Sequence, residues 1–543
     1  MDRRQFLKGF KATKTTAPKL QGNRQLFAGI QPYSGSWTRT EVIHLLKRTQ
    51  FAAKKQDVDY FLGLGPEAAV DLLLNDSPVP APPLRDYGLL DVEGTKYQDL
   101  GVPIGQTWVN DLNKVSDPMA KPAINGARIE SLRSWMAGLM LNNSRSITEK
   151  MVLFWHHHFS VQKEEVDNAT MLYRHHMLLR NNVMGNIKNL TLAVSIDPAM
   201  LRHLNGYLNS KKAPDENYAR ELQELMTVGK GPDSLYTEAD VMAAARVLTG
   251  WRISDETLTS YLSASEHDTN PKQFSAFYKN TSINSSDAAQ ELQQLTDMIF
   301  ANKETARFIC RKLYKWFVYY NIDATIEANV IVPMADLLQS SGYEIKPVLK
   351  ALLNSEHFFE TGNLACHIKS PVDLVIGTLV EFNVAIPPLT DYSTGYPFFH
   401  NIYWELAKMQ LDLFQPPDVS GWPSYYQEPM HYELWVNSNS LPKRAVFTDK
   451  LVTENMLDLR GYANQATDPA NPVKLVEEIA GMLLQYPLST ASQDYLRNRF
   501  LLANSNNNNV WTNAWNSNDQ ATINQGLQGL FMCIMNLPEY HLC

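Results

Sequence analysis

The fold of this chain is clearest in one stretch, Pro214-Asp-Glu-Asn-Tyr-Ala-Arg-Glu-Leu-Gln-Glu-Leu-Met-Thr-Val-Gly229. Its apolar residues recur at helical spacing, and Gly229 is the residue type that commonly ends a helix. The stretch therefore predicts a helix over about residues 214–228. One side of this helix, its polar arc, carries Glu216, Asn217, Arg220, Glu221 and Glu224. The opposite, apolar arc carries Tyr218, Leu222, Leu225 and Met226.

Helical spacing recurs along most of the chain, whereas strand-like alternation is scarce. Thr38 or Thr40 can cap the first helix, and Ser146 with Glu149 has the spacing of a capping box. Further helices are expected over residues 41–50, 146–155, 237–248, 286–320, 327–356, 370–382, 401–413, 472–485 and up to Asn536. The predicted fold class is mainly α, a large multi-helix globular body with little β structure. It forms one body, or two lobes that meet near segments 154–160, 215–229 and 416–423.

Composition favours a folded chain and disfavours several classes of partner. The 543 residues are 44% hydrophobic and 20% charged, with 11 Trp, 24 Tyr and 21 Phe, which is a globular composition. A net charge of −8 gives no overall attraction to nucleic acid or anionic lipid. No apolar run approaches the roughly 20 residues of a membrane-spanning helix. We expect a flexible basic arm over residues 1–38 and a single large helical domain over 39–543.

The first residues resemble an export signal. Asp2-Arg3-Arg4-Gln-Phe-Leu-Lys8 matches the core of a twin-arginine motif. The next residues, 9–30, are interrupted by four basic side chains and lack the apolar segment of a complete signal peptide. Export to the periplasm or beyond, bound to a partner with a complete signal, is the favoured interpretation. The alternative is a cytoplasmic protein whose basic N-terminus resembles the motif by chance.

The four cysteines are few and widely spaced: Cys310, Cys366, Cys533 and Cys543. None forms a C-x-x-C pair, so neither a zinc site nor a redox motif is predicted. Buried free thiols are favoured. A bridge between Cys533 and Cys543 is the alternative for an exported protein.

A run of three histidines lies in Phe154-Trp-His-His-His-Phe-Ser160. His156 and His158 lie roughly 200° apart on a helix but on the same side of an extended segment. A two-histidine metal site therefore requires the preceding helix to end at Trp155. With Glu216 or Glu221 added, the mixed set would suit a transition metal. The alternative is that the run is partly core and partly surface.

Two loops combine glycine and tryptophan, Thr249-Gly-Trp251 near Arg246 and Gly421-Trp422 near Asp418. Core anchoring beside tight turns is one interpretation. An aromatic platform for a saccharide or peptide is the other. A third polar loop contains His267-Asp268. These two residues form either an oriented acid/base pair or a turn in which Asp268 bonds the backbone.

Many of these segments, taken in order, resemble the bacterial family labelled domain of unknown function 1800. The similar segments are Arg48-Thr-Gln-Phe51, Phe154–Ser160, Asp215–Leu222, Ala245–Trp251, His267-Asp268 with Lys272, Lys369-Ser-Pro371, Pro416–Pro423, Trp435-Val-Asn-Ser438, Arg444 and Leu537-Pro-Glu-Tyr540. They run from about residue 40 to the end. The resemblance implies a helical body, frequent export, and genes that neighbour those of sulfatase-like or phosphatase-like proteins. It implies no established activity.

The polar arc of helix 214–228 is either an ordinary solvated ladder of salt bridges or a face that contacts a ligand or another buried part of the fold. Because the resemblance includes the arc as a whole, we expect it to be substantially buried and to face 154–160. We also expect Arg220 to pair with a carboxylate.

Two functions follow from these alternatives. The favoured one is a binding or scaffold subunit for a sulfatase-like or phosphatase-like partner, because no metal spacing or triad is individually strong. The other is a metal-assisted hydrolase with a divalent metal cofactor. Its catalytic residues would be Glu216, Arg220, Glu221, Glu224, His267 and Asp268. Its ligand-binding residues would be Asn217, Arg246, Trp251, Asp418 and Trp422, and its metal ligands His156 and His158.

Overall fold

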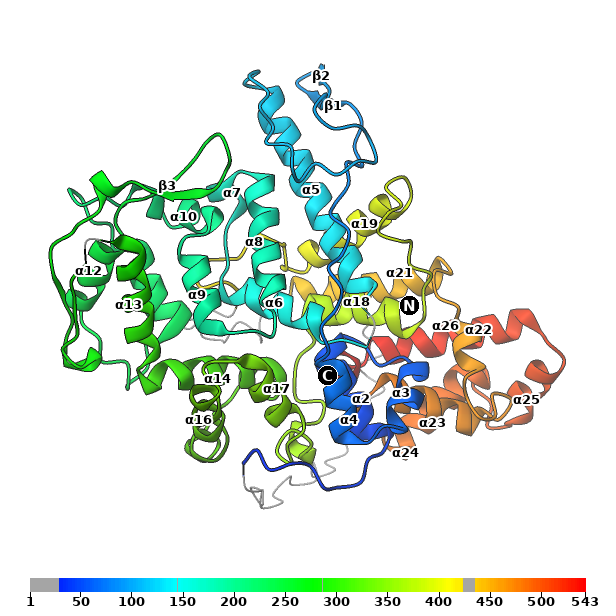
Figure 1. The fold of residues 1–543 in the computed structure, drawn as a ribbon. Helices are drawn as coiled ribbons and strands as arrows, with labels where there is room; N and C mark the ends of the chain where they lie inside the picture. The colour runs from blue at the N-terminus through cyan, green and yellow to red at the C-terminus, as the bar shows by residue number, and fades with distance from the viewer. Residues whose placement is uncertain (1–28, 144, 286, 423–434) are drawn as a thin grey trace.

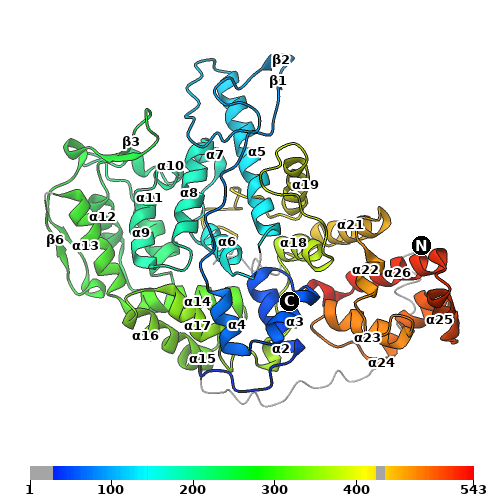
Figure 2. The same ribbon diagram turned by 45° about the vertical axis from the view of Figure 1, so that its right-hand side comes forward.

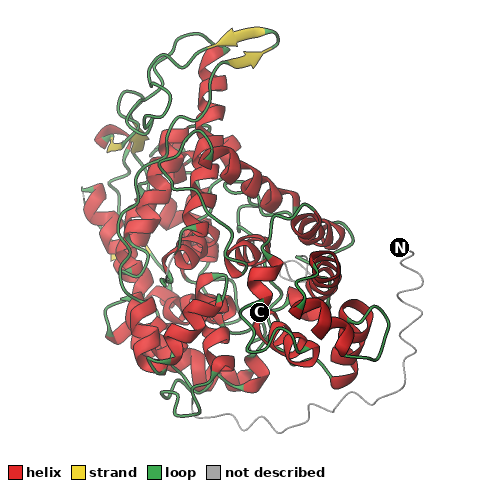
Figure 3. Cartoon of the chain, turned by 90° about the vertical axis from the view of Figure 1, so that its right-hand side faces the viewer, coloured by secondary structure: helices red, strands yellow, loops and turns green. Residues whose placement is uncertain are grey.

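Helices make up most of the structure, a computed structural model that describes residues 29–143, 145–285, 287–422 and 435–543 (Figure 3). The strands in these ranges pair as three short antiparallel hairpins, β1 (Leu90–Val92) with β2 (Thr95–Tyr97), β3 (Trp251–Ile253) with β4 (Ser260–Leu262), and β5 (Lys272–Gln273) with β6 (Ser282–Ile283). The predicted mainly α class is confirmed. No described helix is long and apolar enough to cross a membrane.

The N-terminal helices are α2 (Arg39–Gln50), α3 (Lys55–Leu62) and α4 (Pro66–Leu73). Thr38 and Glu41 form a reciprocal capping box at the start of α2, as the sequence indicates. Part of the predicted arm is packed: the Tyr33 amide donates to the Asn354 carbonyl (2.7 Å), and the Trp37 indole to the Phe61 carbonyl (3.1 Å). The Arg3-Arg4 motif lies outside the described residues.

The central part of the chain begins with α5 (Ala120–Leu141), which packs along α19 (Gly395–Lys408), as Figure 1 shows. The other central helices are α6 (Thr148–His158), α7 (Lys163–Val166), α8 (Ala169–Asn181), α9 (Ile187–Ser195), α10 (Pro198–His203), η1 (Gly206–Leu208), α11 (Asn217–Glu221), η2 (Leu222–Thr227), α12 (Glu238–Val247), η3 (Ala264–Glu266) and η4 (Ala276–Tyr278). They bury a large apolar core that includes the tryptophans Trp108, Trp135 and Trp155.

The remaining helices are α13 (Ala288–Phe300), α14 (Lys303–Phe317), α15 (Ala324–Ile326), η5 (Glu327–Ile331), α16 (Val332–Ser340), α17 (Ile345–Leu353), η6 (Thr361–Asn363), α18 (Pro371–Glu381), α21 (Ser440–Thr453), α22 (Leu459–Ala463), α23 (Pro472–Leu483), α24 (Thr490–Leu496), η7 (Arg497–Leu501), α25 (Asn509–Asn516), α26 (Gln520–Met535) and η8 (Pro538–His541). In Figures 1 and 2, α12 and α13 lie at one end of the molecule and α22 to α26 at the other.

Two local predictions are wrong. The Ser146 hydroxyl accepts a hydrogen bond from the Thr148 amide (3.1 Å), but Glu149 pairs with Arg180 instead of closing a capping box. A buried arginine is a stronger partner for this carboxylate than a backbone amide. The second concerns Asn504-Ser-Asn-Asn-Asn-Asn-Val-Trp-Thr-Asn513, whose composition predicts a surface loop over the whole stretch. The loop is shorter, because α25 begins at Asn509.

Three segments distant in the sequence meet near the end of α6. The His158 imidazole lies 3.0 Å from the Met226 carbonyl of η2, and the Ser160 hydroxyl donates to the Val419 carbonyl (3.3 Å). Gly421 has a φ of +85°, and a Cβ there would lie 2.4 Å from the His157 carbonyl. Only glycine fits such an approach without strain. These contacts bring the end of α6, the end of η2 and the loop that contains Gly421 together.

Candidate functional site

The candidate site is built on α11, which continues without a break into the π-helix η2. The apolar arc is buried as predicted, with Tyr218, Leu222, Leu225 and Met226 each at most 4% exposed. A π-helix is rare and often marks a functional position. Here Glu224 lies within the wider π-helical turn, and Glu221 is the residue directly before it.

The C-terminal end of η2 is held by side chains from two other helices. His158 of α6 donates from Nε2 to the Met226 carbonyl, and Lys312 of α14 donates to the Leu225 carbonyl (3.0 Å). The Lys312 ammonium also lies 3.1 Å from His158 Nδ1. Burial, reinforced by Lys315, lowers the pKa of Lys312 to about 7. Carbonyls at a helix end lack partners within the helix, so these side chains fix where η2 ends.

Arg220 lies within an ion-pair network on the polar arc. Its guanidinium contacts Glu216 of the preceding turn (2.8 Å) and Glu238 at the start of α12 (2.7 Å). About a third of the Arg220 side chain is exposed, so the network is only partly screened from water. The predicted pairing of Arg220 with a carboxylate is confirmed.

The arc does not face 154–160 as predicted. Its polar partners come from α12 and from the loop that contains Lys230, which pairs with the buried carboxylate of Glu224 (3.1 Å). The segment 154–160 meets the carbonyl end of η2 instead, through His158. Asn217 is exposed, and among the described residues its side chain donates only to the Leu204 carbonyl (3.3 Å). It therefore has a structural contact and lies outside the ion-pair network of Arg220.

Glu221 differs from its neighbours on the arc. Within the described residues its half-buried carboxyl group accepts no hydrogen bond and forms no ion pair. Burial, then the charge of Glu224, raises the pKa of Glu221 to about 7. Asp418 adds to this increase, whereas Arg220 and Lys230 oppose it. Glu221 therefore carries a proton in about half of the molecules at neutral pH.

Asp418 brings a third carboxylate to this position from the loop after α19. Its own Oδ1 accepts a hydrogen bond from the Ser420 amide (2.8 Å), which fixes the turn. Of the charges that act on the pKa of Glu221, that of Asp418 has the smallest effect. We call Glu221, Glu224 and Asp418 the acidic face. Two of these carboxylates also act on the phenol of Tyr236. Burial, then the charge of Glu224, raises the pKa of Tyr236, to which Glu221 and Glu238 add, whereas Arg220 lowers it.

The two tryptophans predicted as a ligand platform are buried. Trp422 is 1% exposed and stacks on His157 with ring centroids 4.6 Å apart, and Trp251 is 8% exposed at the start of β3. Neither indole face is open to a saccharide or peptide. The platform interpretation is therefore wrong, and core anchoring, the alternative, agrees with the structure.

The condition for a two-histidine metal site is not met. Helix α6 runs through His158 instead of ending at Trp155, so His156 and His158 point to different sides. His156 accepts a hydrogen bond from the Phe414 amide (3.3 Å), and burial lowers its pKa to about 3, whereas His158 caps η2. In the ranges that the structure describes, no group of three or more His, Cys, Asp or Glu side chains has metal-site geometry.

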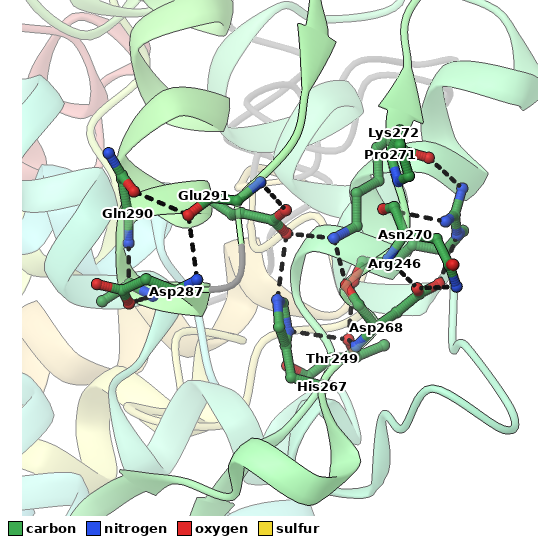
Figure 4. Close-up of polar contacts among 12 residues, drawn as sticks. Arg246, Thr249, His267, Asp268, Asn270, Pro271, Lys272, Asp287, Gln290 and Glu291 are labelled. Carbon is green, nitrogen blue, oxygen red and sulfur yellow. Dashed lines mark hydrogen bonds and ion pairs between the residues drawn. The ribbon is translucent and has the colours of Figure 1, made fainter.

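His267 and Asp268 do not form an acid/base pair with each other. His267 Nδ1 lies 2.9 Å from the Thr249 carbonyl, and its Nε2 lies 3.2 Å from Glu291 (Figure 4). Asp268 pairs with Arg246 (2.7 Å) and accepts from the Asn270 amide (2.9 Å). Burial alone would raise the pKa of Asp268, but the hydrogen bonds from Arg246 and Asn270 outweigh it and lower the pKa to about 2. The turn interpretation is the one that the structure supports.

Glu291 of α13 is the centre of that second network. It is fully buried, and it contacts both His267 and the equally buried Lys272 of β5 (Figure 4). Arg246 also donates to the carbonyls of Asn270 and Pro271, so it fastens the end of α12 to the same loop. A fully buried, mutually paired network of this kind holds loops together.

Several residues of both networks were not predicted from the sequence. Lys230, Tyr236, Glu238 and Lys312 surround the arc, and Glu291 organises the loop of His267. Of these residues, only Glu238 could have been placed from the sequence, because Thr237 predicts that a helix begins beside it. The others lie on different elements, and their proximity depends on how helices pack.

Comparison with known proteins gives one match. A family described as "Protein of unknown function (DUF1800)" matches residues 44–542, nearly the whole chain. No curated protein matches the chain, and no solved structure does.

Proposed function

Because this chain belongs to the DUF1800 family of proteins of unknown function, its role has to be argued from the site, and we propose that it is a binding subunit. Its acidic face, Glu221, Glu224 and Asp418, holds a basic segment of a partner protein. The observation that carries this proposal is the half-buried carboxyl group of Glu221, which has no partner among the described residues.

The excess of negative charge at the acidic face favours a cationic ligand. Arg220 is already neutralised by Glu216 and Glu238, so it adds little positive charge toward Glu221. Lys230 is largely exposed and pairs with Glu224. Three carboxylates thus face one exposed ammonium group. A guanidinium or ammonium group from a partner would complement this excess, and complementary charge gives an interface its specificity.

The raised pKa of Glu221 gives such binding a pH dependence. A cation binds the ionised carboxylate, so binding releases the proton that Glu221 holds in about half of the molecules near pH 7. Affinity should therefore rise with pH and level off above the pKa of Glu221. The protonated group at low pH offers the cation no charge.

The resemblance suggests which partner to test first. A sulfatase-like or phosphatase-like protein with a complete export signal would bind this subunit folded and carry it out of the cytoplasm. That route accounts for a twin-arginine motif at Arg3-Arg4 that lacks an apolar segment. Localisation in the periplasm or outside the cell is part of the same proposal.

A second function rests on the same carboxyl group. A glutamic acid with a pKa of about 7 suits general acid–base chemistry, and Glu224 lies three residues away as a second carboxylate. Carboxylate oxygens also suit hard divalent cations. A hydrolase that uses Glu221 as its acid would lose turnover in Glu221→Gln but would show no selective binding of basic peptides.

Binding of a labelled peptide tests the first proposal. A short peptide with three arginines is compared by fluorescence anisotropy at pH 8 with the same peptide carrying neutral citrulline, which keeps the shape and removes the charge. We expect the arginine peptide to bind and Glu221→Gln to weaken it by about tenfold or more, the loss of one charge-assisted contact. Glu454→Gln, on the exposed end of α21, removes the same charge elsewhere and should leave binding unchanged. Equal binding of both peptides would overturn the proposal.

A further inference from the structure

Several residues that share the family's motifs have no place at the acidic face. Arg48, Lys369 and Arg444 come from three distant segments, and they are 1%, 2% and 0% exposed. Arginine and lysine are almost never fully buried unless they are paired. Their burial therefore requires an explanation of its own.

One short segment, residues 366–370, brings these cations together. Arg48 donates to the Cys366 sulfur (3.1 Å), and Arg444 donates to the Lys369 carbonyl (2.7 Å). Asp373 accepts from the Ser370 hydroxyl (2.7 Å) through one oxygen and pairs with Lys150 of α6 through the other. We call Arg48, Lys150, Lys369 and Arg444 the basic centre.

The thiol of Cys543 is a common reference point for three of the four cations. Its amide donates to the carbonyl of His367 (2.8 Å), so the residue lies beside the 366–370 segment. Burial and Asp373 raise the pKa of this thiol, whereas the charges of Arg48, Lys150 and Lys369 lower it. The charges of these three cations therefore all act on the Cys543 thiol.

Positive charge exceeds negative charge at the basic centre, although the charges of Asp373 and Cys543 both act on Lys369 and Arg444. Asp373 neutralises Lys150, and the neighbouring pair Lys47–Glu381 is balanced in itself (3.0 Å). No described carboxylate forms an ion pair with Arg48, Lys369 or Arg444. The ammonium of Lys369 lies 4.1 Å above the Tyr540 ring, a contact weaker than an ion pair.

The two arginines also retain donors without acceptors. Nε and Nη1 of Arg48 and Nη1 of Arg444 are buried and have no hydrogen-bond partner in the part of the chain that the structure describes. The remaining guanidinium nitrogens donate to uncharged acceptors, among them the Val318 and Trp435 carbonyls. A buried charge left without a partner is strongly unfavourable, so a group that supplies negative charge and acceptor oxygens is required.

We propose that the basic centre encloses one small inorganic oxyanion, of the phosphate or sulfate class, bound by Arg48, Lys369 and Arg444. Such an anion carries up to two negative charges and several acceptor oxygens, which matches two arginines with orphan donors and the ammonium group of Lys369. The centre is buried, so the anion is taken up as the chain folds and stabilises the fold. It lies near Lys150 in the first turn of α6, whereas the acidic face lies beyond the other end of that helix.

Anion analysis of the full-length protein tests this site. Protein exchanged into chloride buffer is denatured in acid, and the released anions are measured by ion chromatography. We expect close to one equivalent of phosphate or sulfate per chain from the wild type and much less from Arg444→Gln. Lys450→Gln, an exposed control on α21, should release as much as the wild type. The same stoichiometry in Arg444→Gln would place the anion elsewhere and overturn the proposal.

Thermal unfolding of the wild type tests the site even if Arg444→Gln does not fold. Protein refolded without oxyanions is titrated with phosphate or sulfate below 1 mM, at constant ionic strength in chloride. We expect Tm to rise saturably, by about 2 to 3 °C at a hundredfold excess over Kd for a chain of this length. If no stoichiometric anion is released and Tm is also the same in all salts, no oxyanion binds and the proposal fails.

Discussion

The Nε2 atom of His158 lies 3.0 Å from the carbonyl oxygen of Met226, in the last turns of the π-helix η2. Through this contact a helix that began 78 residues earlier in the sequence sets the end of the helix that carries Glu221 and Glu224. The histidine is fully enclosed, and burial, then the charge of Lys312, lowers its pKa well below the usual range, so it donates as a neutral ring. Its role is to position η2.

Replacement of His158 should therefore weaken the fold. In His158→Ala the Met226 carbonyl loses its donor inside the protein, which costs about 1 to 3 kcal/mol, and the lost ring leaves a cavity. His400→Ala, where the ring is only partly buried beside Trp404, is the matched control. Unfolding in urea measures both. Equal losses in the two variants would show that the contact with Met226 contributes nothing of its own.

Arg220→Ala should lower the stability of the fold only slightly. The guanidinium and its partner Glu216 are each about a third exposed, and Glu238 is mostly exposed, so water screens the network. Partly exposed ion pairs contribute about 1 kcal/mol or less. Chemical denaturation is expected to show a loss of that order. A loss of 3 kcal/mol or more would mean that Arg220 supports the fold far more than its exposure indicates.

Glu221→Gln should stabilise the protein at high pH. The folded-state pKa of Glu221, about 7, is above its ordinary value of 4.5, so folding favours the protonated form. This favourable contribution is complete below pH 4.5 and is lost as pH rises through 7. The uncharged amide of Glu221→Gln should therefore raise the free energy of unfolding by on the order of 1 to 3 kcal/mol at pH 8 and leave it unchanged at pH 4.5. Glu454→Gln should show no such difference between the two pH values, and a Glu221→Gln variant that is destabilised at pH 8 would contradict the assignment.

Lys272→Met should destabilise the protein strongly, because it leaves Glu291 charged in a fully buried position beside His267. Breaking a buried pair by removing one partner costs about 3 to 5 kcal/mol. Lys350→Met removes an exposed lysine from its pairs with Glu67 and Asp71 and should cost no more than about 1 kcal/mol. Thermal unfolding of the two variants side by side checks the contrast. Similar Tm values would mean that the buried network is not required for stability.

Local features of the chain could be predicted from the sequence because their signals are local. Thr237 and Gly250 bracket α12, and the opposite arcs of 214–228 separate the buried Leu222 from Glu221, since cap residues and periodicity act within a few residues. The π-helical winding of η2 left no such signal.

The errors at the site come from contacts between distant segments. The end of α6 at His158, instead of Trp155, depends on η2 and on the 416–422 loop that pack against it. Whether Trp422 was a platform or an anchor depended on His157, which covers its face. Arg246 and Asp268 form an ion pair although they lie 22 residues apart in the sequence, and no spacing rule predicts that contact.

Calorimetric titration of the triple-arginine peptide into the wild type and Glu221→Gln, from pH 5.5 to pH 8, tests the central claim most directly. In buffers of different ionisation enthalpy the same titrations count the protons released. We expect wild-type affinity to rise with pH and to level off above pH 7, with about half a proton released per peptide at pH 7. Glu221→Gln should bind weakly at every pH and release no proton. Binding that is independent of pH and equal in both proteins, or no binding by the wild type at pH 8, would contradict it.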